Sequence, residues 1–169
     1  MRFSKSGLVS VFAVLALAVP TVATADKPVK EPTPYSPFTF DAGVVCPFAV
    51  DLSFPSDANF QITHTDKTGA VRWIWGGGHN VARVTNHSTG NSVTINDTGP
   101  GKVTINDDGS LTLDGTGHWL VGYFPTDVPA GPRMILYSGH IVLHVAPDGQ
   151  LTLVSYDGTA PQDVCAMVA

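Results

Sequence analysis

Basic side chains are scarce in this chain of 169 residues. Lysine and arginine together number nine against fourteen aspartates and glutamates, and charged residues make up only 14% of the sequence. Affinity for nucleic acid depends on neutralising phosphates with basic side chains, and binding to an anionic membrane surface needs the same basic excess. The composition therefore argues against a nucleic-acid-binding protein and against a protein held on a lipid surface.

Sequence motifs that mark enzymes are also missing. The nucleophile elbow G-x-S-x-G is absent, and the glycine run 76–78 is not followed by the lysine and helix start of a phosphate-binding loop. Ser138 stands two residues before His140, but a catalytic triad needs a geometry that one such pair does not supply. We assign no catalytic residue and no cofactor-binding residue, and the balance favours a non-catalytic protein.

No group of residues has the spacing of a metal site. Among six histidines only His140 and His144 are close in sequence, and on a strand four residues span about 13 Å, too far to bind one ion. The turn 107–109 lacks the ligand series and the closing glutamate of a calcium-binding EF-hand loop. No metal and no cofactor are predicted.

Cysteine occurs only twice, at Cys46 and Cys165. In an exported protein an isolated pair of cysteines usually forms a disulfide, and we predict one here. It would close a loop of about 120 residues and contribute on the order of 4–5 kcal/mol by chain-entropy estimates. The alternative is two free thiols, although no basic cluster flanks either cysteine to activate it.

Only one long apolar run is present, over residues 8–19. Arg2 and Lys5 precede it and the small-x-small site 23–25 follows it, an order typical of a secretory signal peptide. The run is too short for a membrane-spanning helix, which needs roughly 20 apolar residues. We predict cleavage after Ala25 and secretion of the remainder into the extracellular space, free of the membrane.

The expected mature chain has two parts. Residues 26–37 contain four prolines among polar residues and are predicted to form an extended linker, with order beginning near Phe38. Residues 38–169 are predicted to form a single β domain. Removing Arg2 and Lys5 with residues 1–25 leaves seven basic against fourteen acidic residues, a formal net charge of −7.

Short strand signals recur about every ten residues from Phe38 to Tyr156. Apolar and polar residues alternate over 93–96, 103–106 and 111–114, and each segment is followed by a turn rich in Asp and Gly, at 97–101, 107–109 and 114–117. Further strands are predicted at 47–54, 59–65, 70–76, 80–87, 117–124, 133–138, 139–146 and 150–156. The pattern predicts an all-β fold: an antiparallel β-sandwich or β-barrel of about 8–11 short strands, with a short C-terminal helical turn over 161–168.

Two features of this β pattern bear on topology. Residues 93–99 (VTINDTG) and 103–109 (VTINDDG) nearly repeat each other, and we interpret them as a duplicated hairpin, because two copies do not make a solenoid. Residues 119–124 and 134–137 are apolar on both faces, so these strands need a cover on each side. A central position in a sandwich is favoured over a subunit interface.

Trp73 and Trp75 alternate with Ile74, so both indoles point to one side of a strand. An indole face can stack on a sugar ring or another flat ligand, and this is the most specific binding hypothesis that the sequence offers. The interpretation that we favour is that both tryptophans lie in the core, with Arg72 on the solvent side.

A further pattern consists of strand and turn residues spread over the chain: Cys46-Pro47-Phe48-Ala49-Val50, Thr85-Asn86, Thr89-Gly90, Ser92-Val93, Asn96, Gly99-Pro100, Asp108-Gly109-Ser110 and Cys165. This pattern resembles a group of small secreted proteins of actinomycete bacteria that carry no assigned function. The resemblance covers roughly residues 40–168. It implies an extracellular β domain with a disulfide near its ends and brings no catalytic residues. In architecture alone the chain is also similar to small β-barrels of the allene oxide cyclase type.

Taken together, these features favour a secreted, non-catalytic module that binds an extracellular ligand or protein. The alternative is a small β-barrel enzyme, an isomerase, cyclase or hydrolase, with an interior pocket. A closed barrel with a polar-tipped interior cavity would favour an enzyme or a carrier, whereas a solid sandwich that exposes Trp73 and Trp75 would favour surface binding.

Overall fold

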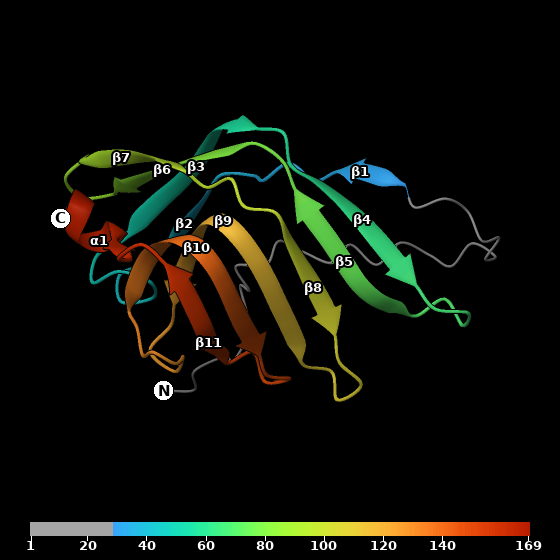
Figure 1. Ribbon diagram of the computed structural model, residues 1–169. Coiled ribbons are helices and arrows are strands. Elements are labelled where there is room, and N and C mark those ends of the chain that lie inside the picture. The colour runs from blue at the N-terminus through green and yellow to red at the C-terminus, as the bar shows by residue number, and fades with distance from the viewer. Residues whose placement is uncertain (1–28) are drawn as a thin grey trace, which may run out of the picture.

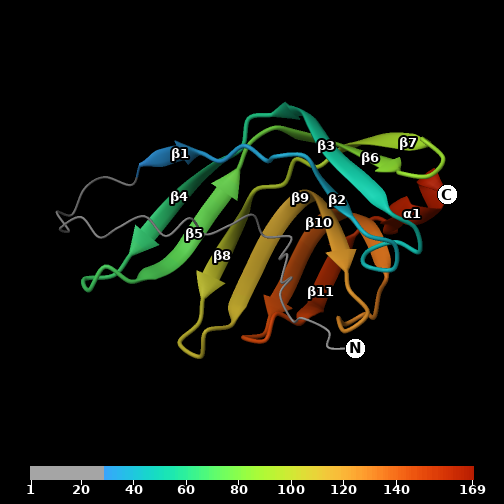
Figure 2. The same ribbon diagram turned by 180° about the vertical axis from the view of Figure 1, so that it is seen from behind.

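The structure is a computed structural model that describes residues 29–169, so the predicted signal peptide lies outside the described residues. Twelve strands and one short helix are present in this range, arranged in an eight-stranded and a four-stranded antiparallel sheet. The smaller sheet lies against one end of the larger one (Figures 1 and 2). The predicted all-β, sandwich-like fold is confirmed, with slightly more strands than expected.

The larger sheet follows the spatial order β1-β4-β5-β8-β9-β10-β11, and β12 pairs with β10. Its strands are β1 (Lys30–Pro32), β4 (Phe60–Thr65), β5 (Val71–Gly77), β8 (Gly101–Ile105), β9 (Leu111–Tyr123), β10 (Arg133–Val145), β11 (Leu151–Gly158) and β12 (Gln162–Asp163). The smaller sheet, in the order β2-β3-β6-β7, contains β2 (Phe38–Phe40), β3 (Val50–Asp57), β6 (Asn80–Asn86) and β7 (Ser92–Asn96). Neither order returns to its first strand, so the described fold is an open sandwich rather than a closed barrel.

The longest strands, β9 and β10, are each thirteen residues long and pair without a register shift. The prediction of a turn at 114–117 is therefore wrong, and so is the prediction of two separate strands at 133–138 and 139–146. Gly117 and Gly139 face each other in this ladder with φ of 92° and 153°. Glycine tolerates such angles, so the chain can twist there without leaving the strand.

The two repeated segments, 93–99 and 103–109, join different sheets. β7 pairs with β6 in the smaller sheet, whereas β8 pairs with β5 and β9 in the larger sheet, so the interpretation as a duplicated hairpin is wrong. In the second copy, Asp107 lies exposed in the β8–β9 turn. In the first copy, the side chain of Asp97 accepts hydrogen bonds from the Leu120 backbone N–H (2.8 Å) and from the Asn80 side chain (3.0 Å). These bonds hold the chain where it crosses between the sheets.

Four connections cross from one sheet to the other: residues 33–37, 58–59, 78–79 and 97–100. They are tied together by backbone hydrogen bonds, in which Ala58 N–H donates to the His79 carbonyl (2.8 Å) and Asp97 N–H donates to the Asn80 carbonyl (2.9 Å). The side chain of Asn80 is buried, and its side-chain amide oxygen Oδ1 has no hydrogen-bond partner among the described residues. The crossings thus form one compact, polar corner of the molecule.

The main hydrophobic core lies between the two sheets. It joins side chains of the smaller sheet, such as Val50 and Val84, to Met134 and Leu136 of β10 and to the helix α1 (Val164–Val168). Its buried members are Phe40, Val45, Cys46, Val50, Leu52, Val84, Ile95, Met134, Leu136, Val164, Cys165 and Val168. The disulfide between Cys46 and Cys165 is present within this core, and α1 confirms the predicted C-terminal helical turn.

A second core covers the opposite face of β9 and β10. Its buried members are Leu113, Val121, Tyr123, Tyr137, Ile141, Leu143 and Leu151. The hydroxyls of Tyr123 and Tyr137 are hydrogen-bonded to each other at 2.8 Å, which satisfies two polar groups inside an apolar cluster. The strands that are apolar on both faces are therefore central, as predicted, and the smaller sheet with α1 covers one of those faces.

The proline-rich segment contributes more than a linker. Residues 30–32 form the edge strand β1, which pairs with β4. Pro32 lacks a backbone N–H and is tolerated there because an edge strand needs hydrogen bonds on one side only. Within residues 29–169, no helix has the length and apolar character that crossing a membrane would require.

Replacing both cysteines, as Cys46→Ala/Cys165→Ala, is expected to lower the free energy of unfolding by about 4–5 kcal/mol, because the bond closes a long loop of the unfolded chain. Urea unfolding followed by circular dichroism measures the change. Wild-type protein with added reductant serves as the control and should fall to the same stability. A loss below about 1 kcal/mol would show that the bond constrains the unfolded chain little.

Burial raises the pKa of Asp97 to about 7, because desolvation outweighs the hydrogen bonds that favour its charged form. The folded state thus holds a proton that an unfolded aspartate releases near pH 3.8. The resulting stabilisation is complete below that pH and is lost as the pH rises towards 7, by up to about 4 kcal/mol. Urea unfolding from pH 4 to 8 should show this fall in wild type and in the exposed control Asp157→Asn.

The variant Asp97→Asn should lose most of that pH dependence. An asparagine side chain can still accept a hydrogen bond from Leu120 N–H. It can also donate one to the unpartnered side-chain oxygen of Asn80, once the side-chain amide of Asn80 flips. Equal slopes for wild type and Asp97→Asn would assign the pH dependence to other groups.

Candidate ligand-binding face

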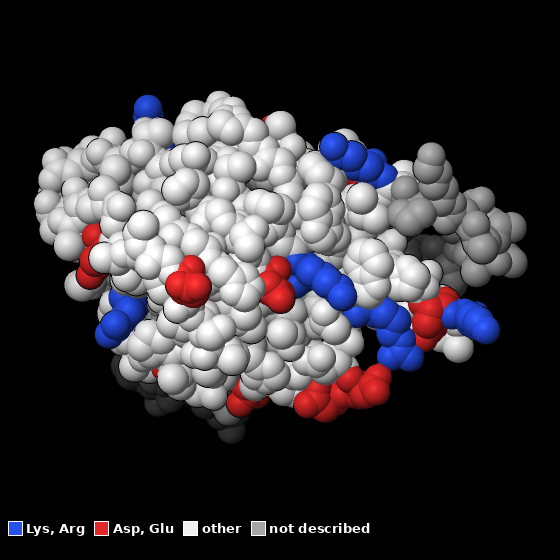
Figure 3. All heavy atoms as spheres, in the orientation of Figure 1, with Lys and Arg blue, Asp and Glu red and all other residues white. Residues whose placement is uncertain are grey.

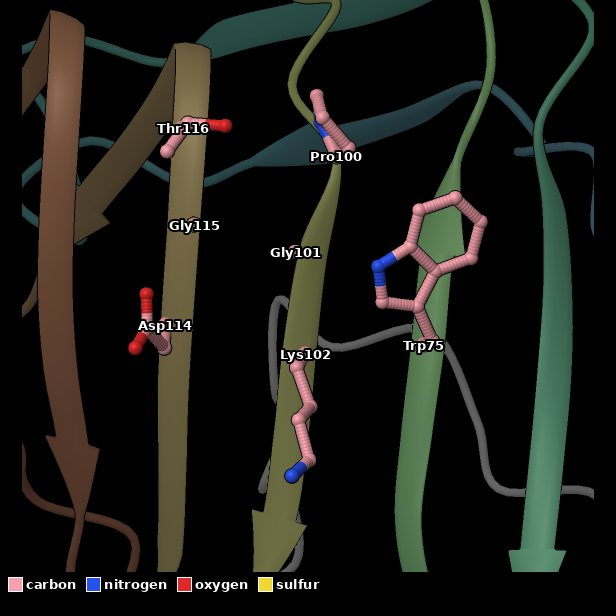
Figure 4. A pocket seen from close by; sticks show the side chains of 7 residues that line it. All are labelled: Trp75, Pro100, Gly101, Lys102, Asp114, Gly115 and Thr116. Atoms are coloured by element: carbon pink, nitrogen blue, oxygen red, sulfur yellow. The ribbon is translucent and has the colours of Figure 1, made fainter.

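Five residues of the larger sheet form one row across its strands. The register pairs Lys30 with Ile62, Ile62 with Trp75, Trp75 with Lys102, and Lys102 with Asp114. Directly paired residues of antiparallel strands point to the same face of a sheet, so all five side chains share one face. Figure 4 shows Trp75, Lys102 and Asp114 on three adjacent strands of this face. We call the five residues the cross-strand row and this side of the sheet the Trp75 face.

Trp75 stands at the centre of the row with 38% of its surface exposed. Its nearest aromatic neighbour is Phe60, at 5.5 Å between ring centroids and a tilt of 50°. Trp73 is stacked on His64 at 4.8 Å and 11°. Neither tryptophan belongs to a buried core, so the favoured interpretation of two core tryptophans is wrong. The smaller sheet covers the other end of the larger sheet and leaves β5 open on this side.

Arg72 projects to the opposite face from Trp73, as alternation predicts, and remains half exposed. Its guanidinium binds Asp66 at 2.8 Å and Asp107 at 2.9 Å, which links the β4–β5 turn to the β8–β9 turn. Hydrogen bonds from Thr68, Arg72 and Ala70 hold the pKa of Asp66 well below its usual range. Arg72 and the two aspartates that it binds lie away from the Trp75 face.

Both lysines of the row are held over aromatic rings. The ammonium of Lys30 lies 3.6 Å from the centroid of Phe60, and that of Lys102 lies 5.4 Å from the ring of Trp73. A cation over a ring face is attracted by the negative face of the π-system. Within residues 29–169 neither lysine forms an ion pair with a carboxylate. Each ammonium therefore keeps hydrogen-bond donors for a ligand.

A shallow depression of about 350 Å³ lies beside Trp75. The residues that line it are Trp75, Pro100, Gly101, Lys102, Asp114, Gly115 and Thr116. Figure 4 shows Trp75 on one side, the strand with Asp114, Gly115 and Thr116 on the other, and the strand with Pro100, Gly101 and Lys102 between them. The backbone at Gly101 and Gly115 forms the floor, and Pro100 and Lys102 border it.

Trp119 explains why glycine occupies this floor. A Cβ atom built on Gly101 or Gly115 would lie 2.6 Å from the Trp119 indole, which packs under these strands on the opposite face. The indole N–H donates to the Thr116 carbonyl at 3.0 Å and fixes the ring there. Trp75 thus bounds the depression on one face of the sheet, and Trp119 supports its floor from the other face.

A second depression, of about 460 Å³, lies towards the β1 edge. It is lined by Lys30, Pro32, Pro34, Asp57, Ala58, Asn59 and Phe60. Asp57 organises this loop, because its carboxylate accepts hydrogen bonds from the backbone N–H groups of Tyr35 and Asn59. The carboxylate oxygens can accept further bonds from the open side.

Polar pairs continue the Trp75 face beyond the row. Asp114 binds His140 at 2.8 Å, and Ser138 binds His118 across the strands at 2.9 Å. Ser138 thus pairs with His118 rather than with His140, and His118 has no carboxylate partner among the described residues. This arrangement is not a catalytic triad. Within the described range, no three His, Cys, Asp or Glu side chains converge as a metal site would require.

The Trp75 face offers an exposed apolar ring, ammonium donors and carboxylate acceptors on a flat surface, the combination that a hydroxylated ring-shaped ligand requires. In the view of Figure 3, charged side chains are scattered over a mainly uncharged surface, without a field of one sign. No family model, no curated protein and no solved structure matches this chain.

Sequence reasoning found Trp73 and Trp75 but missed Lys30, Lys102 and Asp114. Alternation within a strand could have placed each of these side chains on a face. It could not have aligned them, because the row depends on the register between strands that are distant in sequence.

Placing a methyl group beneath the floor, as Gly115→Ala, is expected to lower the free energy of unfolding by about 1–3 kcal/mol, because it collides with Trp119. Thr116→Ala, at an exposed neighbouring position, should change it by less than about 0.5 kcal/mol. Urea unfolding of Gly115→Ala, Trp119→Leu and the double variant tests the contact. Strictly additive losses would show that the two residues do not interact.

Proposed function

We propose that this protein is an exported, non-catalytic module that binds a neutral carbohydrate on the Trp75 face. The observation that carries the proposal is the exposed indole of Trp75 beside a flat depression whose polar groups, Lys102 and Asp114, have opposite charge. The module would act outside the cell on a soluble or surface-bound glycan.

The chemistry of a sugar ring fits this arrangement. One side of a pyranose carries mainly C–H groups and can lie on an indole face, while the ring's hydroxyls both donate and accept hydrogen bonds. Lys102 supplies donors, Asp114 supplies acceptors, and the Thr116 hydroxyl supplies both. A strongly anionic ligand would meet Asp114, and a strongly cationic one would meet Lys102, so the balance favours a neutral ligand.

The shape of the site supports binding rather than catalysis. Catalytic sites are usually concave and exclude water around the reacting atoms. The depression beside Trp75 is shallow, and its floor is the backbone of two neighbouring strands (Figure 4). Such a surface suits a polymer that passes across it, because the ends of a long chain remain free.

Export is supported by two features of different kinds. The apolar run 8–19 with its small-x-small site is typical of a signal peptide. The disulfide between Cys46 and Cys165 is of a kind that persists in oxidising compartments.

The variant Trp75→Ala tests the proposal. Wild-type protein should be retained by at least one neutral polysaccharide among cellulose, chitin, xylan and mannan, measured by pull-down and by affinity electrophoresis. Trp75→Ala should bind at least about tenfold more weakly, because it removes the stacking surface. Its thermal melting should stay close to that of wild type, since Trp75 lies outside both hydrophobic cores.

Val154→Ala is a matched control. Val154 is an exposed apolar residue on β11, at the far edge of the same sheet, and its loss should not change retention. The proposal is overturned if no polysaccharide retains wild-type protein more strongly than it retains Trp75→Ala.

A further inference from the structure

The depressions on the two sides of Trp75 share three kinds of residue. Each contains a lysine held over an aromatic ring, one aspartate and at least one proline. We infer that they are two subsites for one ligand, a linear neutral oligosaccharide that runs across the strands along the cross-strand row. This inference rests on the proposed function and specifies the length and direction of its ligand.

The register sets the direction. Lys30, Trp75 and Lys102 lie on β1, β5 and β8, which follow one another in the sheet with only β4 between the first two. Neighbouring strands are about 4.8 Å apart, so the two lysines lie about 14 Å apart across three strand spacings. That span exceeds one sugar ring, and an oligosaccharide must cross Trp75 to contact both lysines.

Beside Trp75 on β5, the position between the subsites carries no side chain. Gly77 pairs with Phe60 and lies on the Trp75 face between them. A Cβ atom at Gly77 would stand 3.4 Å from Pro100, which lines one depression, and 3.8 Å from Phe60, which lines the other. With glycine at this position the surface between Pro100 and Phe60, beside Trp75, stays open.

The charges of the two subsites identify the class of polymer. Lys30 faces the same depression as Asp57, and Lys102 faces the same depression as Asp114, so each subsite combines one cation with one carboxylate. Both lysines lack ion-pair partners among the described residues and keep free donors. Two subsites of one composition fit a chain whose successive units are alike and uncharged.

Isothermal titration calorimetry with the di-, tetra- and hexasaccharide of the retained polysaccharide tests this inference. The affinity of wild-type protein should rise at least about tenfold from disaccharide to hexasaccharide, as the second subsite becomes occupied. Lys30→Met keeps the aliphatic stem and removes the ammonium, so it should weaken hexasaccharide binding about tenfold. Disaccharide binding should change by less than a factor of two, because Trp75 and Lys102 remain.

Phe60→Leu is a second variant, which removes the ring under the Lys30 ammonium and should also weaken hexasaccharide binding. Because Phe60 also neighbours Trp75, the length dependence is judged on Lys30→Met. Lys67→Met is the matched control, because Lys67 is an exposed lysine in the β4–β5 turn outside both depressions. It should leave every affinity unchanged.

The outcomes separate the two proposals. Equal affinity for disaccharide and hexasaccharide, or equal weakening of both by Lys30→Met, would overturn the two-subsite inference while leaving a single sugar site at Trp75. We expect Trp75→Ala to lose affinity for both the disaccharide and the hexasaccharide. We also expect the gain in affinity from disaccharide to hexasaccharide to depend on Lys30. Absence of saccharide binding by wild type would overturn the proposed function itself.

Discussion

The fold depends on the thirteen-residue ladder between β9 and β10, whose two faces are used differently along its length. At one end, Leu136 and Met134 pack under the smaller sheet and α1. By alternation the same face continues to His140 and Asp114, where the smaller sheet has ended and polar side chains face solvent. The opposite face buries Ile141 and Leu143 in the second core. One continuous pair of strands therefore joins both cores and supports the Trp75 face.

The Trp75 face exists because the smaller sheet is half the size of the larger one. Four strands cover only part of an eight-stranded sheet, and β4, β5 and β8 extend beyond them (Figure 1). Large apolar groups on an uncovered sheet usually mark a binding surface in a soluble protein. The aromatic rings here are partly shielded by one another and by lysine ammonium groups, as at Phe60 with Lys30. Trp75 remains exposed, with 38% of its surface accessible.

The three tryptophans show how one residue type takes different roles. Trp119 lies flat against the glycine backbone of β8 and β9 and supports the floor from the second core. Trp73 stacks on His64 and lies under Lys102, so it acts as a support for the row. Trp75 projects into solvent at the edge of the depression. All three indoles come from strands of the same sheet. Their roles differ because of the face of that sheet on which each lies and how far other groups cover it.

The sequence by itself determined the all-β class, most strand positions, the C-terminal helical turn and the pairing of Cys46 with Cys165, because alternation, turn chemistry and a lone cysteine pair are local or unambiguous signals. Only the tertiary structure decided which sheet each strand joins. The near-identical segments 93–99 and 103–109 divide between the two sheets, since the hydrogen-bonded carboxylate of Asp97 fixes the first and an exposed turn ends the second. Alternation likewise placed Trp73 and Trp75 on one face but could not say whether that face is covered, because coverage depends on strands that are distant in the chain.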